Sequence, residues 1–481
     1  MRWTNDQVAR ALGVALPTGL NPVARLAGVS IDSRTVGRGE LFFAIHGPRH
    51  DGHAFVAQSL AAGAGAAVVA QSRLGEYAAE IQAKLFTVPD TLAALQQLAR
   101  AIRREWGGRV AAVAGSVGKT TTKEILAALV AARFCTLKTE GNLNNEYGLP
   151  LTLAKLEPEH EAAVVELGMS RRGELARLTQ IAEPQVGLIT RIAIEHLEFF
   201  ASLDEIALAE RELIENLPGR ETVAVLNADD PYAAQFAGVA PGRVVTFGMQ
   251  ARADFCVEAI EDLGADGSAF TFIAPEGAAK LRLALVGRHN VVNALAALAA
   301  ASVWGIGAKE AAEVLPRMKP AAMRGEVLRF EEGFAVINDS YNSSPTAMAS
   351  VIDLLANTPG YRRKILVAGE MLELGPGSAE LHREAGRYAA AKKLDFLIGV
   401  QGDASEIVKA AAAGGMSDNV LAFYPNSAAA GAFLAGLVRQ GDLVLVKGSR
   451  GVRMERAIDA VRSKHALIGS GGAVPSAAER H

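Results

Sequence analysis

The sequence predicts an α/β fold of three domains, and three features of the chain support this prediction. An apolar run at 110–114 leads through a glycine-containing turn into a helix that begins at Lys119. In two long stretches, short apolar segments alternate with helical segments, which is typical of a largely parallel sheet with helices on both faces. The chain has 481 residues, 50% of them hydrophobic, which is enough for about three domains with separate cores.

Composition argues against several classes of partner. The formal net charge is −3 and both signs are mixed along the chain, so we expect neither a nucleic-acid nor a membrane partner. Cys135 and Cys256 are too few for a disulfide framework, which fits a reducing compartment. Arg2 and Asp6 precede any long apolar run, so no signal peptide is expected. The uncharged run at 291–308 is rich in alanine and predicts a buried helix. We therefore expect a cytoplasmic protein.

The first domain is expected at 1–106. Strands are predicted at 41–45 and 66–70, and helices at 55–62 and after Asp90, which caps the second helix. A Trp-Gly-Gly sequence then ends the pattern. Polar residues near the strand ends suit a phosphorylated or sugar ligand, although turn formation explains them equally well. They are Ser33, Arg34, His46 and His53.

The second domain, at 107–318, opens with a phosphate-binding loop. Its turn contains Gly115, Ser116 and Gly118, and its helix begins with Lys119, Thr120 and Thr121. In such a loop, backbone N–H groups and the helix N-terminus face an anion, the lysine neutralises charge and the first threonine ligates Mg²⁺. The strict pattern has a glycine where Val113 stands, so the motif is a shortened form.

Further strands of this domain are predicted at 162–165, 186–189, 222–226 and 244–247. Polar residues follow each strand, and ligands of parallel sheets bind beyond the carboxyl ends of the strands, so these residues should meet the phosphate loop in one crevice. Glu166 and His196 are then candidate ligands of a divalent metal.

Two asparagine-containing segments have alternative interpretations. Asn144 and Asn145 either hydrogen-bond a polar substrate group or form an Asx turn that caps the next helix. His289, Asn290 and Asn293 open the alanine-rich helix, where they either reach a purine edge or cap the helix.

The third domain is expected at 319–466, after a proline-containing linker. Strands are predicted at 334–338, 364–368 and 443–446, and each ends in polar or glycine-containing residues. This is again the pattern of an α/β sheet with a crevice at its carboxyl edge. The Gly/Ala/Ser-rich tail at 467–481 is expected to be disordered.

Two crevices, one of them suited to a nucleoside triphosphate and a metal ion, suggest domain closure around a reaction. From the residues alone, phosphoryl transfer to a hydroxyl, hydrolysis and carboxylate activation all remain open. The chain lacks a kinase-type His-Arg-Asp base and any motif for mechanical work, which favours carboxylate activation.

Six segments resemble the motifs of the Mur ligases, the ATP-dependent amide-forming enzymes of peptidoglycan synthesis. They lie in family order at 115–123, 141–150, 166–170, 196–198, 287–293 and 447–450. The segment at 339–345 is similar to the D-x-Y-N-A-N-P motif of the D-alanyl-D-alanine-adding branch (the MurF enzymes), and 369–375 also fits that branch. The resemblance implies that the protein joins D-alanyl-D-alanine to UDP-N-acetylmuramoyl-tripeptide (UDP-MurNAc-tripeptide), using ATP and two Mg²⁺ ions, through an acyl phosphate. A single chain looks sufficient for this, so we expect a monomer.

The resemblance also implies roles for the domains and for single residues. The first domain would bind the UDP-sugar, the central one would bind ATP through the phosphate loop, and the third would be Rossmann-like. Thr120 and Glu166 would hold metal ions, with His196 at the second one. Asn290 and Asn293 would lie near the adenine, Arg324 and Asp339 would hold the nucleotide, Tyr341, Asn342 and Pro345 would shape a nucleotide or dipeptide pocket, and Ser33, Arg34 and His53 would contact the UDP-sugar.

The chain departs from the family pattern at three positions. Glu210 stands where the family has a lysine that CO₂ carbamylates to help position the second metal. We hypothesise that the Glu210 carboxylate replaces the carbamate; the alternative is a helix-surface residue. Arg191 stands where asparagine is usual, and Ala114 where threonine is common.

Two rival functions remain at this stage. One is a different amide ligase, such as another Mur enzyme or a folylpolyglutamate synthase, against which the Tyr-Asn-x-x-Pro pattern at 341–345 argues. The other is a nucleotide-binding protein with degenerate catalysis, which Glu210 and Arg191 would motivate.

Overall fold

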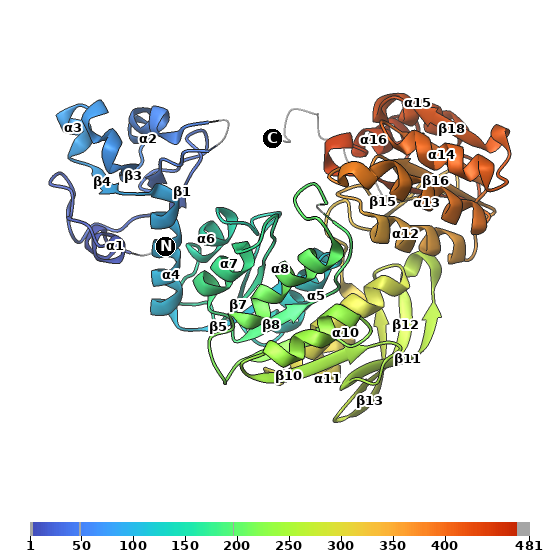
Figure 1. Ribbon diagram of the computed structural model, residues 1–481, viewed down its shortest axis with the longest axis horizontal. Coiled ribbons are helices and arrows are strands. Elements are labelled where there is room, and N and C mark those ends of the chain that lie inside the picture. The colour runs from blue at the N-terminus through green and yellow to red at the C-terminus, as the bar shows by residue number, and fades with distance from the viewer. Residues whose placement is uncertain (1–2, 48–49, 196, 469–481) are drawn as a thin grey trace.

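The computed structural model describes residues 3–47, 50–195 and 197–468, and these residues form three β-sheets in chain order (Figure 1). The sheets have four, nine and six strands, and helices pack against each of them. The predicted three-domain α/β class is therefore confirmed. His196 and almost all of the predicted tail lie outside the described residues. Within the described residues, no helix is both long and apolar enough to span a bilayer.

The first unit is a parallel sheet in the order β1-β2-β3-β4. Its elements are α1 (Asn5–Leu12), β1 (Val29–Ser30), β2 (Leu41–Phe43), α2 (Val56–Ala61), β3 (Ala66–Ala70), α3 (Ala79–Gln82), β4 (Leu85–Val88) and α4 (Thr91–Trp106). The helix predicted at 55–62 starts later than expected, because Gly52–Phe55 forms a 3₁₀ turn first. Asp90 caps α4 as predicted, since its carboxylate accepts the N–H groups of Leu92 and Ala93.

Helix α4 joins the first unit to the second. Its apolar residues Leu95, Leu98 and Ile102 are buried in a cluster that contains side chains of both units. On the other side of the contact, Arg103 donates to the carbonyl oxygens of Ala182 (2.8 Å) and Glu183 (3.1 Å). These two carbonyls end helix α7 (Glu174–Ala182), so α4 both packs on the central unit and caps one of its helices.

The central sheet has the order β13-β12-β11-β10-β9-β8-β5-β7-β6. Its strands are β5 (Arg109–Ala114), β6 (Thr136–Lys138), β7 (Ala162–Glu166), β8 (Val186–Ile189), β9 (Val223–Asn227), β10 (Arg243–Gly248), β11 (Phe255–Asp262), β12 (Ser268–Ala274) and β13 (Gly277–Leu283). The pairs from β6 to β11 are parallel, as predicted, whereas β11, β12 and β13 form an antiparallel extension that was not predicted. Strands β6 and β7 lie on one side of β5, and β8, β9 and β10 lie on the other side. The strand order therefore reverses beside β5, which makes its carboxyl end a topological switch point.

Helices cover both faces of this sheet and form two separate hydrophobic clusters. They are α5 (Lys119–Ala131), α6 (Gly148–Leu153), α7, α8 (Leu203–Glu215), α9 (Pro231–Gln235), α10 (Arg288–Ser302) and α11 (Ala308–Val314). The alanine-rich helix α10 is buried from Val291 to Ala301 apart from Val292, so the prediction of a buried helix is confirmed.

The third unit is a sheet in the order β14-β15-β19-β16-β17-β18, parallel except for β14. Its elements are β14 (Glu326–Arg329), β15 (Ala335–Asp339), α12 (Pro345–Asn357), β16 (Arg363–Gly369), α13 (Ser378–Ala391), β17 (Phe396–Val400), α14 (Ala404–Ala413), β18 (Leu421–Tyr424), α15 (Ser427–Leu437), β19 (Asp442–Lys447) and α16 (Glu455–Lys464). It contacts the central unit, where Arg329 pairs with Asp266 at 2.7 Å and the Glu198 N–H donates to the Glu373 carbonyl at 3.2 Å.

Candidate active site

The phosphate-loop turn links β5 to α5 and requires its glycines. Gly115 and Gly118 have φ angles of +115° and +93°. A Cβ at Gly115 would lie 2.3 Å from the Thr190 hydroxyl, and one at Gly118 would lie 2.4 Å from Oδ1 of Asn293. Only glycine fits both positions, because the backbone conformation and the close neighbours each exclude a side chain. The N-terminus of α5 is thereby left open toward the cavity described below.

Residues after β8 hold this loop in place. The Thr190 hydroxyl donates to the Val117 carbonyl at 2.7 Å, and the Ser116 N–H donates to the Arg191 carbonyl at 2.7 Å. The Ser116 hydroxyl in turn accepts the Ala193 N–H at 3.0 Å. The expected convergence of strand ends on the loop is therefore present for β5 and β8.

Lys119 lies folded over the loop. Its Nζ donates to the carbonyl oxygens of Gly115 and Ser116 and lies 3.5 Å from a carboxylate oxygen of Glu195. Burial opposes the charged form of this ammonium, but nearby carboxylates outweigh that effect and raise its pKa. These carboxylates belong to Glu195, Glu210 and Glu166. The Lys119 ammonium and the Glu166 carboxylate are therefore close enough to interact electrostatically.

Glu195 was not among the predicted site residues. Its place directly before His196, shortly after a strand end, was the signal that could have revealed it.

Glu166 ends β7 and has one unpaired carboxylate oxygen. Its side chain is 3% exposed, and Oε1 accepts a hydrogen bond of 2.8 Å from the Asn144 amide. Its Oε2 is buried and receives no hydrogen bond from the described residues. A buried carboxylate oxygen without a donor is costly unless a cation or ligand completes it, so this atom fits a divalent metal. Within the described residues no three His, Cys, Asp or Glu side chains form a preassembled metal cluster.

Glu210 lies beneath the phosphate loop and is not a surface residue. It is 1% exposed, and its Oε2 accepts the Gly115 N–H at 2.8 Å. Burial raises the pKa of Glu210 to about 8, against the opposing effect of Lys119. The alternative of a helix-surface role is therefore wrong.

A cavity of about 470 Å³ extends from the phosphate loop to the third unit. It is lined by most of the residues predicted to hold a nucleotide, together with two of those predicted to shape the pocket: Ser116, Gly118, Thr121, His289, Asn290, Asn293, Arg324, Asp339, Tyr341 and Asn342. The carboxyl ends of β5 in the central sheet and of β15 and β19 in the third sheet thus open into one space. Arg191 and Glu195 also line it.

The central side of this cavity is formed by the start of α10. Asn290 donates to the Val286 carbonyl at 2.8 Å, and its own Oδ1 accepts from the Asn293 amide at 3.0 Å. Asn293 therefore presents its Oδ1 to Gly118 of the loop, which accounts for the close approach noted above. Removal from water lowers the pKa of His289, which favours the neutral imidazole.

On the side of the third unit, Lys447 is buried and paired with Asp339, and its Nζ also donates to the Asn342 carbonyl at 2.9 Å. The Arg324 guanidinium lies 4.2 Å from the centre of the Tyr341 ring. Pro345 does not line the cavity; it is the first residue of α12, after the capping Ser344, and its neighbours Ser344 and Thr346 line the space instead.

The two loop asparagines both make internal hydrogen bonds. Asn144 orients Glu166, as described above. The side-chain Oδ1 of Asn145 accepts the N–H groups of Tyr147 (3.2 Å) and Gly148 (2.9 Å), which is the Asx-turn alternative considered from the sequence.

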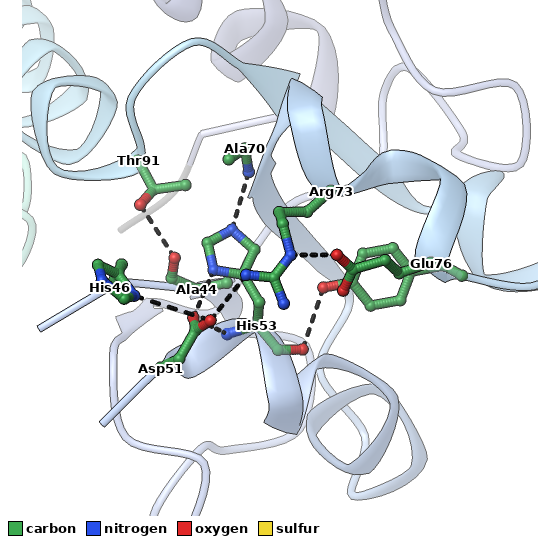
Figure 2. A network of polar contacts seen from close by, with 9 residues as sticks. Ala44, His46, Asp51, His53, Ala70, Arg73, Glu76 and Thr91 are labelled. Carbon is green, nitrogen blue, oxygen red and sulfur yellow. Dashed lines mark hydrogen bonds and ion pairs between the residues drawn. The ribbon is translucent and has the colours of Figure 1, made fainter. Parts of the chain in front are cut away.

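Polar residues also gather at the carboxyl edge of the first sheet (Figure 2). His53 is buried; its Nδ1 lies 2.7 Å from Asp51, and its Nε2 accepts the Ala70 N–H at 3.0 Å. Because Nε2 is an acceptor, Nδ1 carries the proton and both ring nitrogens are used inside the protein. Asp51 also binds Arg73 at 2.8 Å. The hydrogen bonds from His53 and Arg73 lower the pKa of Asp51 against the effect of burial.

Two more of the residues predicted in this domain, Ser33 and Arg34, lie after β1. Arg34 is exposed and forms a two-pronged ion pair with Asp32, and its own N–H donates to the same carboxylate. These hydrogen bonds lower the pKa of Asp32 to about 2. Ser33 lies between them and is partly exposed.

Comparison with known proteins shows similarity along nearly the whole chain. Three family models match: "Mur ligase family, catalytic domain" at residues 25–103, "Mur ligase middle domain" at 113–301 and "Mur ligase, glutamate ligase domain" at 323–450. A Bacillus subtilis (strain 168) protein named UDP-N-acetylmuramoyl-tripeptide–D-alanyl-D-alanine ligase is 35% identical over 436 residues, covering 90% of this chain and 92% of that protein. The relative of the same name from Escherichia coli (strain K12) is 34% identical and covers 91% and 94%.

Solved structures agree with this result. A crystal structure of MurF from Acinetobacter baumannii matches with a TM-score of 0.86 at 31% identity, covering 96% of this chain and 99% of that one. MurF ligase from Thermotoga maritima in complex with ADP matches with a TM-score of 0.79 at 29% identity, covering 91% and 97%.

Proposed function

Since the chain belongs to the Mur ligase family, we propose that it joins D-alanyl-D-alanine to UDP-MurNAc-tripeptide with hydrolysis of ATP to ADP and phosphate. The two relatives reported above, from Bacillus subtilis and Escherichia coli, carry this activity in their names and are 35% and 34% identical over 90% and 91% of the chain. The observation that carries the proposal is the single cavity into which the phosphate loop and the third-unit segment Asp339–Asn342 both open.

The reaction has two steps. An oxygen of the tripeptide's terminal carboxylate attacks the γ-phosphorus of ATP, the bond to the β–γ bridging oxygen breaks, and ADP leaves. The amine of D-alanyl-D-alanine then attacks the acyl carbon, and the tetrahedral intermediate loses phosphate and a proton to give the amide. Phosphorylation is needed because a carboxylate is a poor electrophile. Lys119 and the N–H groups of the loop stabilise the negative charge that develops at the γ-phosphate.

Two Mg²⁺ ions belong to the proposal. Thr120 and Glu166 would hold metal, with His196 at the second ion, and the unpaired Oε2 of Glu166 supports a cation there. Bound Mg²⁺ neutralises phosphate charge and polarises the γ-phosphoryl group. Asn144 keeps the Glu166 carboxylate oriented toward that position.

The domains would divide the work. We assign the UDP-sugar to residues 1–106, ATP to 107–318 and closure of the site to 319–466. Ser33 and Arg34 are proposed to contact the UDP-sugar, and His53 to position Asp51 and Arg73 beside it. Asn145 and Pro345 would act by shaping their helices, α6 and α12. We further propose a cytoplasmic monomer, since ATP and the UDP-linked precursor are cytoplasmic metabolites and one chain supplies every residue assigned above.

Phosphate release measured with UDP-MurNAc-tripeptide and D-alanyl-D-alanine, singly and together, tests this function. We expect release only when both are present, with one phosphate per amide formed. Release without the dipeptide would indicate hydrolysis. No release with both substrates, while nucleotide still binds, would favour a degenerate nucleotide-binding protein, and activity with glutamate and a folate would favour the folylpolyglutamate-type alternative.

Glu210 is proposed to supply the carboxylate that CO₂ creates on lysine elsewhere in the family. The wild-type enzyme should therefore keep its activity in CO₂-free buffer, because its carboxylate is part of the side chain. Glu210→Lys provides the matched variant: its activity should fall in CO₂-free buffer and recover with bicarbonate. Loss of wild-type activity that bicarbonate restores would refute the assignment.

The pH profile gives a second measurement on the same residue. With a pKa of about 8, the carboxylate form of Glu210 increases as pH rises through that value. A nearby cation favours the carboxylate, so saturating Mg²⁺ should move the acidic limb of kcat/KM to lower pH. In Glu210→Gln this Mg²⁺-dependent movement should disappear.

A further inference from the structure

Arg191 is an exposed cation in the wall of the nucleotide cavity. It lines that cavity together with Ser116 and Glu195. Its neighbours in the chain, Thr190 and Ile192, are at most 5% exposed, whereas Arg191 is exposed. The segment 190–192 after β8 is thus packed into the core on both sides of Arg191, whose side chain lines the cavity.

The backbone that carries Arg191 is fixed on two sides. Its carbonyl accepts the Ser116 N–H of the phosphate loop at 2.7 Å. On the other side, Asn227 donates to the Thr190 carbonyl at 2.9 Å and Asp230 accepts the Ile192 N–H at 2.7 Å. These anchors hold the base of the side chain at the first residues of the loop. Such preorganisation lowers the entropic cost of binding an anion there.

The other cations that line the cavity already have partners. Lys447 is paired with Asp339, Arg450 with Glu455 at 3.0 Å, and Arg324 stacks on Tyr341. For Arg191, the described part of the chain shows no hydrogen bond or ion pair of the guanidinium. A cation whose backbone is fixed and whose guanidinium is unpaired in a pocket suits an anionic ligand group.

We propose that Arg191 binds the phosphoryl group that is transferred from ATP to the substrate carboxylate, an inference that rests on the proposed function. Arg191 is tied to Ser116, at the start of the loop, and Lys119 reaches back over the same residue toward Glu195. In a phosphate loop the lysine contacts the β- and γ-phosphates, while the helix N-terminus contacts the α- and β-phosphates. Arg191 is therefore on the γ-phosphate side.

The guanidinium suits this task chemically. It stays charged and presents paired N–H groups that match two oxygens of a phosphate. As the carboxylate oxygen bonds to the γ-phosphorus and the bridging bond breaks, negative charge spreads over the transferred group, and a cation there stabilises it. An asparagine, the residue that the family resemblance places here, carries no charge.

Nucleotide binding to purified Arg191→Gln tests the proposal. Dissociation constants are measured by calorimetry, with Mg²⁺, for ADP and for the non-hydrolysable ATP analogue AMP-PCP. We expect AMP-PCP to bind about tenfold to a hundredfold more weakly, as for loss of a charged hydrogen bond, with ADP binding almost unchanged. Arg191→Lys should recover part of the loss. Arg172→Gln, an exposed arginine outside the cavity, is the control and should match wild type.

Three outcomes would overturn the inference. They are unchanged binding of both nucleotides, equal weakening of both, and a raised KM for UDP-MurNAc-tripeptide with normal AMP-PCP binding; the last would assign Arg191 to the acceptor substrate. Thermal unfolding of each variant identifies a folding defect. If Arg191→Gln has such a defect, the nucleotide affinities of Arg191→Lys are used for the test instead. The binding assay contains neither UDP-MurNAc-tripeptide nor D-alanyl-D-alanine. It therefore tests the role of Arg191 in nucleotide binding even if the wild-type protein forms no amide.

Discussion

Lys119→Met should lower kcat by roughly a thousandfold, as for removal of one preorganised donor to developing negative charge. Methionine keeps most of the length and volume of the side chain, so the loop loses a charge rather than its packing. The ammonium lies among the phosphate-loop carbonyls and is 17% exposed, so methionine leaves this largely buried position without a cation. Steady-state kinetics with all three substrates measures the effect.

The same variant should also be less stable in the absence of nucleotide. Removal of Lys119 takes away the cation that faces the carboxyl groups of Glu195, Glu210 and Glu166, and loss of one partner from a buried charged cluster destabilises a fold. Lys138→Met is the matched control, since Lys138 is 46% exposed and pairs with Glu124 outside the cavity. If kcat of Lys119→Met stays within tenfold of wild type, the proposed role of the loop lysine is wrong.

Glu166→Gln should reduce kcat by about a hundredfold or more and shift the Mg²⁺ requirement to higher concentration. Glutamine keeps the shape of the side chain and can still accept from Asn144, but it no longer offers a charged oxygen ligand. An Mg²⁺ titration of the rate, for wild type and variant, measures the shift.

The stability of the metal-free Glu166→Gln protein separates a functional from a structural role. Oε2 of Glu166 receives no hydrogen bond from the described residues, so replacing the carboxylate removes little native bonding. We expect the metal-free Tm to change by a few degrees at most. Glu215→Gln, at the end of α8, is the control and should leave the Mg²⁺ titration unchanged. A large fall in Tm with an unaltered Mg²⁺ requirement would contradict the metal assignment.

Much of the fold and of the candidate site could be predicted from the alternation of strands, loops and helices in the sequence. Buried strands in the central sheet are continuous apolar runs, and their polar ends meet because parallel strands share one carboxyl edge. That is why Lys119, Glu166 and the start of α10 could be placed together from sequence. The strands β11, β12 and β13 form consecutive antiparallel hairpins and were still missed, because several positions in β11 and β13 are exposed and the apolar pattern there is weak.

Side-chain partners were harder to predict than positions. His53 follows a strand and is polar, but sequence gives no sign that Asp51 and the Ala70 N–H occupy both of its nitrogens. Asn145 likewise stands in a motif yet caps α6. Glu195 was missed because its contact with Lys119 depends on how the run after β8 folds back over the loop.

Helix α4 packs against both the first and the central unit, and this limits how the first domain can be exchanged between proteins during evolution. A graft boundary at the start of the central sheet would remove the apolar face of α4 and Arg103, exposing the surfaces of α6 and α7 that α4 covers and leaving the last carbonyls of α7 without these donors. A recombinant that acquires a new sugar-recognition module must therefore inherit the matching surface of its neighbour as well. Selection should thus transmit the first two sheets as one heritable block.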